Sequence, residues 1–186
     1  MAFRRGFKAE AERIAVEVRR RIGQGAADRL DVEALCHHLD VRLIKMSDLP
    51  CDCSIFKGIG GGSFSAVTVP RGLQTAIVHN DTHHPHRQRS NICHELAHCF
   101  LGHKAVASLD ENGERIYDSG IEAEANFLGG ALLLPHEAAM YVLLNGLRSH
   151  ATNIFGISKL MLDFRLRASG AEAHYKNKMR KLQVAG

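Results

Sequence analysis

The chain has 186 residues, of which 45% are hydrophobic and 24% are charged, and it carries a formal net charge of +4. This length and composition fit one globular domain that buries a substantial core. No run approaches the roughly 20 apolar residues that a membrane-spanning helix needs, so no membrane partner is expected.

The cysteines indicate the cellular compartment. The five cysteines are an odd number, which fits a reducing cytoplasm better than a disulfide framework. Residues 1–8 lack the apolar stretch of a signal peptide.

The charge is unevenly distributed along the chain. Residues 1–29 hold eight Lys or Arg and four Asp or Glu, a net charge of +4. Residues 165–186 hold six Lys or Arg and one Glu, a net charge of +5, so residues 30–164 sum to −5. These basic ends could contact nucleic acid. Solvated helix faces explain the same charges, and we favour that explanation, so direct nucleic-acid binding is not expected.

The N-terminal half predicts two helices followed by a small sheet. Apolar residues recur at three- and four-residue spacing through residues 7–22, which predicts an amphipathic helix, and Asp31 can cap a short second helix. Three runs rich in β-forming residues predict strands: residues 41–46, 63–69 and 75–79. A turn at Pro70-Arg71-Gly72-Leu73 would join the last two strands as a hairpin. The expected fold is a mostly helical α+β single domain with a small three-stranded sheet beside the helices.

The most informative stretch is His94-Glu95-Leu96-Ala97-His98, within an apolar segment that predicts a helix. Positions i and i+4 share one helix face, so His94 and His98 can present both imidazoles to one metal ion. Glu95 lies beside them and can act as a general base toward a water on that ion. The plainer alternative is a helix that happens to carry two surface histidines and a glutamate.

A third ligand is expected, because catalytic zinc sites usually combine three protein ligands with one open position. Residues 121–135 predict a buried helix that is acidic in its first turn and stops at a proline. Glu122 and Glu124 point about 200° apart on that helix, and we favour Glu122 as the ligand. Asn126 shares the face of Glu122 and could orient a ligating histidine. The alternative for both acids is a favourable interaction with the helix dipole, which we prefer for Glu124.

A group that stabilises the transition state is harder to choose. Tyr117 is near Glu122 in sequence, and its phenol could donate a hydrogen bond to an oxyanion. His136 and Arg89 could do the same. Ordinary loop packing remains the favoured explanation for Tyr117.

Residues 151–166 predict two helices joined at Gly156, with Ser158 as a cap, in a pattern similar to half of a helix-turn-helix. The second helix could contact DNA. We favour a packed helical pair, with its apolar residues facing a core: Ile157, Leu160, Met161 and Phe164.

Taken together, the segment Arg87-Gln88-Arg89, the HExxH motif and the Glu122-x-x-x-Asn126 helix that ends in Leu132-Leu133-Leu134-Pro135 resemble the ImmA/IrrE family of metallopeptidases. The resemblance covers roughly residues 8–168, which implies a metallopeptidase domain over residues 1–168 and a basic C-terminal helix or tail over residues 169–186. It also implies a zincin-like fold of the gluzincin kind.

By this resemblance His94, His98 and Glu122 are the metal ligands and Glu95 is the general base. The implied substrate is a transcriptional repressor of the Xre/Cro helix-turn-helix kind, in phage, mobile-element or stress regulation. Two imidazoles and a carboxylate suit Zn²⁺, and also Mn²⁺ or Fe²⁺.

Two functions of different classes therefore stand. The first is a cytoplasmic zinc endopeptidase that cleaves a repressor. The second is a non-catalytic regulator that contains metal and binds DNA or a repressor partner. An intact general base favours the first, because a structural zinc site needs none. The sequence predicts no oligomeric state.

Overall fold

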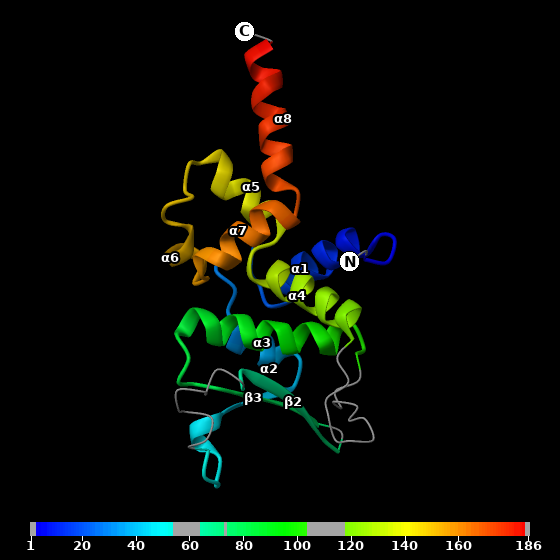
Figure 1. The fold of residues 1–186 in the computed structure, drawn as a ribbon, viewed down its shortest axis with the longest axis vertical. Coiled ribbons are helices and arrows are strands. Elements are labelled where there is room, and N and C mark those ends of the chain that lie inside the picture. The colour runs from blue at the N-terminus through cyan, green and yellow to red at the C-terminus, as the bar shows by residue number, and fades with distance from the viewer. Residues whose placement is uncertain (1–2, 54–63, 73, 104–117, 185–186) are drawn as a thin grey trace.

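The computed structural model describes residues 3–53, 64–72, 74–103 and 118–184. Within these ranges the chain forms eight helices and one small mixed sheet, which confirms the predicted α+β single domain. The helices are α1 (Phe7–Arg21), α2 (Val32–His38), α3 (Pro85–Phe100), α4 (Ser119–Leu133), α5 (His136–Leu144), α6 (Ala151–Phe155), α7 (Lys159–Ala168) and α8 (Ala171–Val184). Figure 1 shows the sheet below α3, α4 on the opposite side of α3, and α8 projecting from the far end of the molecule.

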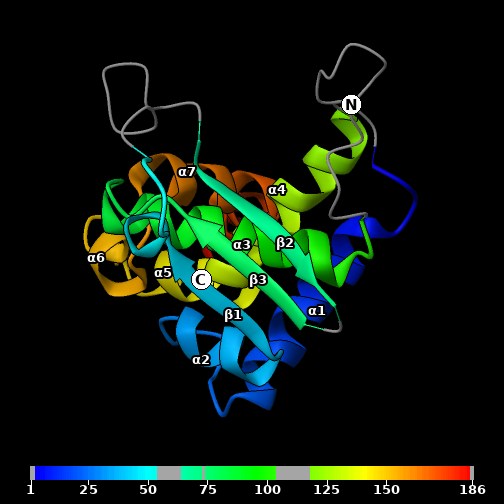
Figure 2. The ribbon, with the colours of Figure 1, turned by 90° about the horizontal axis from the view of Figure 1, so that it is seen from below.

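The sheet has three strands, which lie side by side in front of α3 in Figure 2, where the molecule is seen from below. The strands are β1 (Val41–Lys45), β2 (Ala66–Arg71) and β3 (Gln74–His79), in the order β1-β3-β2. β2 and β3 pair antiparallel, which confirms the predicted hairpin, whereas β1 pairs parallel to β3. The turn is shorter than predicted, because Pro70 and Arg71 belong to β2 and Gly72 makes the reversal at φ 63°. Proline is tolerated there because β2 is an edge strand, where a missing N–H breaks no ladder.

The core is centred on α4, which packs against α3 and α1. From Phe127 to Leu133 every residue of α4 is buried, as expected for a helix that is apolar on all sides. Phe7 of α1 packs edge-on against Phe127 with ring centroids 5.8 Å apart. Among the described helices none is long and apolar enough by itself to cross a membrane, and α4 and α5 meet that test only as a pair bent by 52°.

Two buried arginines hold the C-terminal end of α4. The last carbonyls of a helix lack partners within the helix, and Arg19 supplies them with Nε to Leu132 O at 3.1 Å and Nη2 to Leu133 O at 2.9 Å. Arg165 donates to Leu134 O at 2.9 Å. Burial lowers the pKa of Arg19 to about 10, so its guanidinium stays charged at neutral pH. This end of α4, and with it the position of the whole helix, is therefore fixed from α1 and α7.

Replacing Arg19 with Leu is expected to lower the free energy of unfolding by about 3 kcal/mol or more, because several buried carbonyls lose their donor. Urea unfolding followed by circular dichroism measures this change. Arg20→Leu is the matched control on the same helix: Arg20 is exposed and, among the described residues, pairs with Glu17 at the surface, a kind of ion pair that contributes little to stability. Equal effects of the two substitutions would contradict the role given to Arg19.

A short turn joins α6 to α7, and both helices pack against the rest of the molecule. Gly156 takes the left-handed conformation at φ 62°, and the Ser158 side chain accepts a hydrogen bond from Met161 N. Ile157 is fully buried, as expected, but the prediction for Leu160 is wrong: it is 84% exposed. The buried residues of α7 are instead Leu162, Arg165 and Leu166. The face of α7 that packs on the core therefore differs from the face that its apolar residues predicted. α7 ends at Ala168 and α8 begins at Ala171, while a domain boundary between them stays a prediction.

Candidate metal centre

The two motif histidines lie one turn apart on α3. His84 caps the helix by accepting a hydrogen bond from His86 N, and Pro85 occupies its first turn, where a missing N–H costs nothing. The apolar side of α3 is buried in the core, which leaves His94 and His98 on the other side. Their Nε2 atoms are 3.1 Å apart.

Glu122 reaches the same point from α4. Asp118 caps this helix by accepting hydrogen bonds from Gly120 N and Ile121 N, which places Glu122 in the first turn. Its Oε2 lies 3.2 Å from His94 Nε2, and its Oε1 lies 3.8 Å from His98 Nε2. The packing of α4 against α3 therefore brings Glu122 next to His94.

These three side chains fit a divalent metal ion. Their ligand atoms all lie within 4.8 Å of one another, and ligand atoms about 2.0–2.1 Å from a tetrahedral zinc are themselves about 3.3 Å apart. The donor set contains no thiolate: Cys93 is fully buried on the core side of α3, and burial raises the pKa of its thiol to about 12. Two imidazoles and one carboxylate are therefore brought together as the sequence predicted, on a site that no fourth His, Cys, Asp or Glu completes within the described ranges.

Asn126 contacts one of the two imidazoles. Its Oδ1 lies 3.1 Å from His94 Nδ1. An amide oxygen can only accept, so Nδ1 of His94 carries the hydrogen and its Nε2 lone pair is directed at the cluster. This is the contact by which a polar neighbour typically orients a ligating histidine.

Glu95 is held at the edge of a small cavity. The Thr68 hydroxyl on β2 donates a 2.7 Å hydrogen bond to Glu95 Oε2. The cavity has a volume of about 330 Å³ and is lined by Phe64, Ser65, Ala66, Val67, Asn91, His94, Glu95 and Glu122. One carboxylate oxygen of Glu95 is thus anchored beside the same space that His94 and Glu122 face. Nothing in the sequence pattern singled out Thr68, because its role depends on the position of β2 beside α3.

A glycine allows α3 and α4 to approach closely behind the three candidate ligands. A Cβ at Gly129 would lie 3.0 Å from Cys93 O and 3.1 Å from His94 Cα. The sequence could have indicated this close approach, because Gly129 lies in the interior of a predicted helix. A glycine there lowers helix stability by about 1 kcal/mol relative to alanine, so its presence suggests a packing role.

Gly129→Val is expected to push α4 away from α3, lowering the free energy of unfolding by about 1–3 kcal/mol and weakening metal binding. Thermal unfolding and zinc titration measure the two effects. Ala123→Val, at a partly exposed position of α4, controls for a β-branched residue in this helix. A Gly129→Val chain that is as stable as wild type and binds zinc as tightly would show that the close approach is unnecessary.

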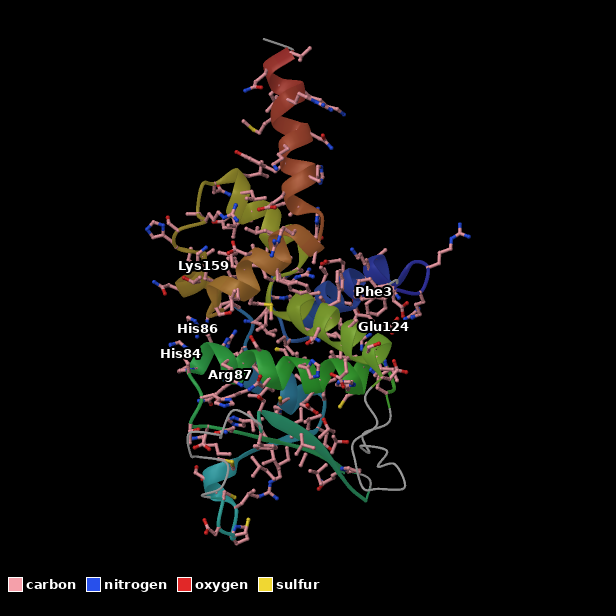
Figure 3. All side chains as sticks on the ribbon, viewed as in Figure 1. Phe3, His84, His86, Arg87, Glu124 and Lys159 are labelled. Atoms are coloured by element: carbon pink, nitrogen blue, oxygen red, sulfur yellow. The ribbon has the colours of Figure 1, made fainter. Side chains whose placement is uncertain are left out.

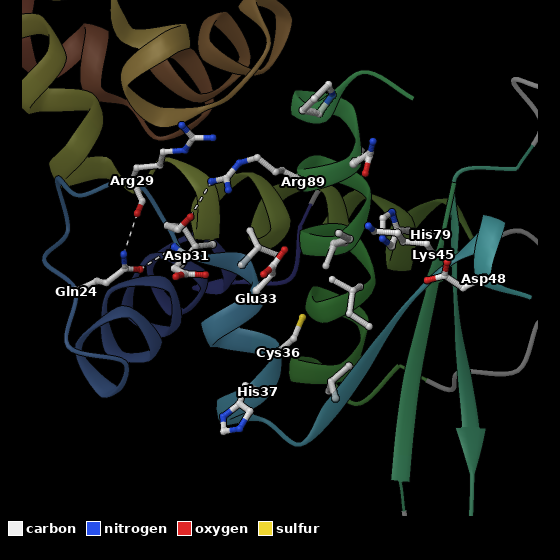
Figure 4. A pocket seen from close by; sticks show the side chains of 17 residues that line it. Gln24, Arg29, Asp31, Glu33, Cys36, His37, Lys45, Asp48, His79 and Arg89 are labelled. Carbon is white, nitrogen blue, oxygen red and sulfur yellow. Dashed lines mark hydrogen bonds between the residues drawn. The ribbon is translucent and has the colours of Figure 1, made fainter. Parts of the chain in front are cut away.

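None of the three residues considered for transition-state stabilisation is found in the cavity of Glu95 within the described part of the chain. Tyr117 lies outside the described residues. Arg89 is engaged elsewhere, since it donates to Leu30 O and Gly156 O and lines a separate cavity of about 860 Å³ between α2, β1 and the start of α3 (Figure 4). His136 lies at the start of α5 against Ser169 O. Neither Arg89 nor His136 is among the residues that line the cavity of Glu95.

Two histidines one turn apart, a glutamate beside them and a carboxylate from a second helix make this a metallopeptidase-like site. Residues 36–167 match the M78 peptidase family, the IrrE N-terminal-like domain. The chain belongs to this family, which confirms the ImmA/IrrE assignment.

Comparison with other proteins adds the fold of one relative. A solved structure of a Mycobacterium tuberculosis transcriptional regulator is similar with a TM-score of 0.51 and 19% sequence identity. The similarity covers 86% of this chain and 46% of that one, so the chain spans about half the length of the regulator. No curated protein matches the sequence. At this identity the similarity concerns the fold.

Proposed function

We propose that the chain is a zinc-dependent endopeptidase in which His94, His98 and Glu122 hold the metal and Glu95 is the general base. The observation that carries this proposal is the convergence of three ligand groups from two helices next to a carboxylate that faces the same cavity. A purely structural zinc site would need no such base and would close its fourth position with Cys or His.

The chain's own residues would divide the chemistry between them. When bound, zinc supplies Lewis acidity toward a peptide carbonyl and acidifies a water molecule. Glu95 accepts the proton from that water and delivers it to the amine that leaves. The Thr68 hydrogen bond holds one oxygen of Glu95, and we assign the proton transfer to the other oxygen.

The edge of the sheet suits a peptide in an extended conformation. Asn80 N donates to Ser65 O, and the register then places Val67 and Val69 in the hydrogen-bonded pairs with β3. The backbone groups of Ala66 and Thr68 consequently face the other side, where no described strand pairs with β2. A substrate segment added along this edge would pass the cavity of Glu95.

The substrate we propose is a helix-turn-helix repressor of the Xre/Cro kind. Membership of the IrrE-like family supports a regulatory role, and the structural relative is itself named a transcriptional regulator. Because a repressor of this kind acts in the cytoplasm, we propose that the protein acts there too.

The direct test is to incubate the zinc-loaded protein with purified helix-turn-helix repressors of the Xre/Cro kind, including any that is encoded next to its gene, and to measure intact masses. Two fragments whose masses sum to the repressor plus one water would identify an endopeptidase and its cleavage site. An intact repressor, with an intact panel of unrelated Xre/Cro repressors, would contradict the substrate proposal.

A regulator without catalysis is the second candidate, and α8 is the observation that favours it. Lys176, Lys178, Arg180 and Lys181 lie on the exposed part of this projecting helix (Figure 1). Duplex DNA binding that weakens steeply with salt would support this candidate. Its absence at low salt would leave the basic residues as a solvated helix face.

A further inference from the structure

His98 contacts a second histidine on the side of its ring that faces away from the candidate metal position. His98 Nε2 belongs to the ligand cluster, whereas its Nδ1 lies 3.0 Å from Nδ1 of His103. The two rings are arranged edge to face with centroids 5.1 Å apart. His103 is five positions after His98, and a helix that continued to it would turn its side chain away from the ligand face.

The end of α3 explains how His103 returns to His98. Gly102 has φ 65°, and its N–H donates to Cys99 O at 3.2 Å. His103 N donates to His98 O at 3.0 Å. These two bonds define a Schellman motif, in which the chain reverses over the last turn of its own helix. The reversal brings the ring of His103 back to His98, where a continuing helix would have carried it around the axis.

Behind His103 lies a charged pair that connects it to other elements. His103 Nε2 is 3.8 Å from Glu124 Oε2 on α4, and Glu124 Oε1 is 3.5 Å from Arg4 Nε. Arg4 also pairs with Glu10 of α1 at 2.7 Å. Figure 3 places Glu124 on the N-terminal half of α4, beside the segment that carries Phe3. Glu124 is 17% exposed and His103 is 11% exposed, so this contact is largely shielded from water.

Hydrogen-bonding rules fix the direction of this arrangement. If Nε2 of His98 gives its lone pair to a metal, Nδ1 must carry the hydrogen and donate it. His103 Nδ1 must then accept, which leaves the hydrogen of His103 on Nε2. That atom faces the Glu124 carboxylate, whose negative charge favours a hydrogen there. The one tautomer that lets His98 bind metal is therefore the one that the surroundings of His103 favour.

We propose that His103 is a positioning residue for His98, and that Glu124 fixes the tautomer of His103. The proposal rests on the metal site of the proposed function. It gives His98 the kind of orienting partner that Asn126 gives His94. Partners of this kind typically change metal affinity by about 10–100-fold when they are removed.

The test compares zinc affinity in His103→Phe and His103→Asn, by competition with a chelator of known affinity. Phe keeps an aromatic ring but accepts no hydrogen bond, whereas the Asn amide oxygen can take the place of Nδ1. We expect His103→Phe to weaken zinc binding about 10–100-fold, and His103→Asn to restore it to within a few-fold of wild type. His86→Phe, at the other end of the same helix (Figure 3), is the matched control and is expected to bind as wild type.

The visible spectrum of the Co²⁺-loaded proteins provides a readout that is independent of activity. His103→Phe should alter the ligand-field bands, and His103→Asn should return them. Wild-type zinc affinity in both variants would overturn the positioning role and leave the metal site intact. Equal losses in both variants would also overturn it, since packing alone would then explain the contact. A wild-type protein that binds no zinc would instead overturn the proposed function.

Discussion

Glu95→Gln is expected to reduce peptide hydrolysis by about 10²–10⁴-fold, the range that a positioned general base contributes, while zinc remains bound at one ion per chain. Gln keeps the size of the side chain and can still accept a hydrogen bond from Thr68, but it cannot take a proton from water. Fragment release measured by mass spectrometry, together with elemental analysis of the same samples, checks both halves of this result.

Glu137→Gln serves as the control for this experiment. Glu137 lies on the exposed face of α5, outside the cavity of Glu95, so its substitution should leave both rate and metal content unchanged. A Glu95→Gln protein that cleaves at the wild-type rate would refute the role of Glu95, and one that loses its zinc would place Glu95 among the ligands.

Glu122→Ala is expected to weaken zinc binding by more than about 100-fold, beyond the range for partners that only orient a ligand. The substitution removes the one carboxylate of the cluster and leaves His94 and His98 alone. Equilibrium dialysis of the metal against a chelator measures the change.

Glu124→Ala provides the comparison from the same helix. Glu124 touches His103 and no ligand directly, so its removal should weaken zinc binding by less than about tenfold, below the effect expected for a direct orienting partner. If Glu124→Ala loses zinc and Glu122→Ala keeps it, the wrong carboxylate has been chosen.

Local periodicity was enough to predict the parts of the fold and site that depend on one helix. The i, i+4 spacing of His94 and His98 specifies one face of a helix whatever surrounds it. Glu122 was preferred to Glu124 because it shares a helix face with Asn126. That Glu122, on a second helix, joins the two histidines was implied by the need for a third ligand and by the family resemblance.

Contacts that depend on tertiary structure were missed. β1 pairs parallel to β3. Alternation of apolar and polar residues predicts a strand, but it does not show which other strand pairs with it. Thr68 reaches Glu95 only because β2 lies beside α3. His103 lies outside the ligand group, as its spacing from His98 indicates, but its contact with His98 Nδ1 depends on the reversal at Gly102 and could not be read from that spacing.

The error at Leu160 has a related cause. Apolar residues of α7 predicted a core-facing stripe, yet the buried position went to Arg165, which binds Leu134 O and lies over the Phe127 ring. An arginine that satisfies the end of another helix can take a core position that hydrophobicity alone would assign to leucine. The sequence of α7 does not contain that information, because the carbonyl it serves belongs to α4.

X-ray absorption at the zinc edge of the purified protein tests the metal centre most directly. The predicted spectrum corresponds to one zinc per chain with two imidazole nitrogens and oxygen ligands at about 2.0–2.2 Å, and no sulfur. A zinc–sulfur shell near 2.3 Å, four histidine or cysteine ligands, or a protein that retains no metal would contradict a catalytic site formed by His94, His98 and Glu122.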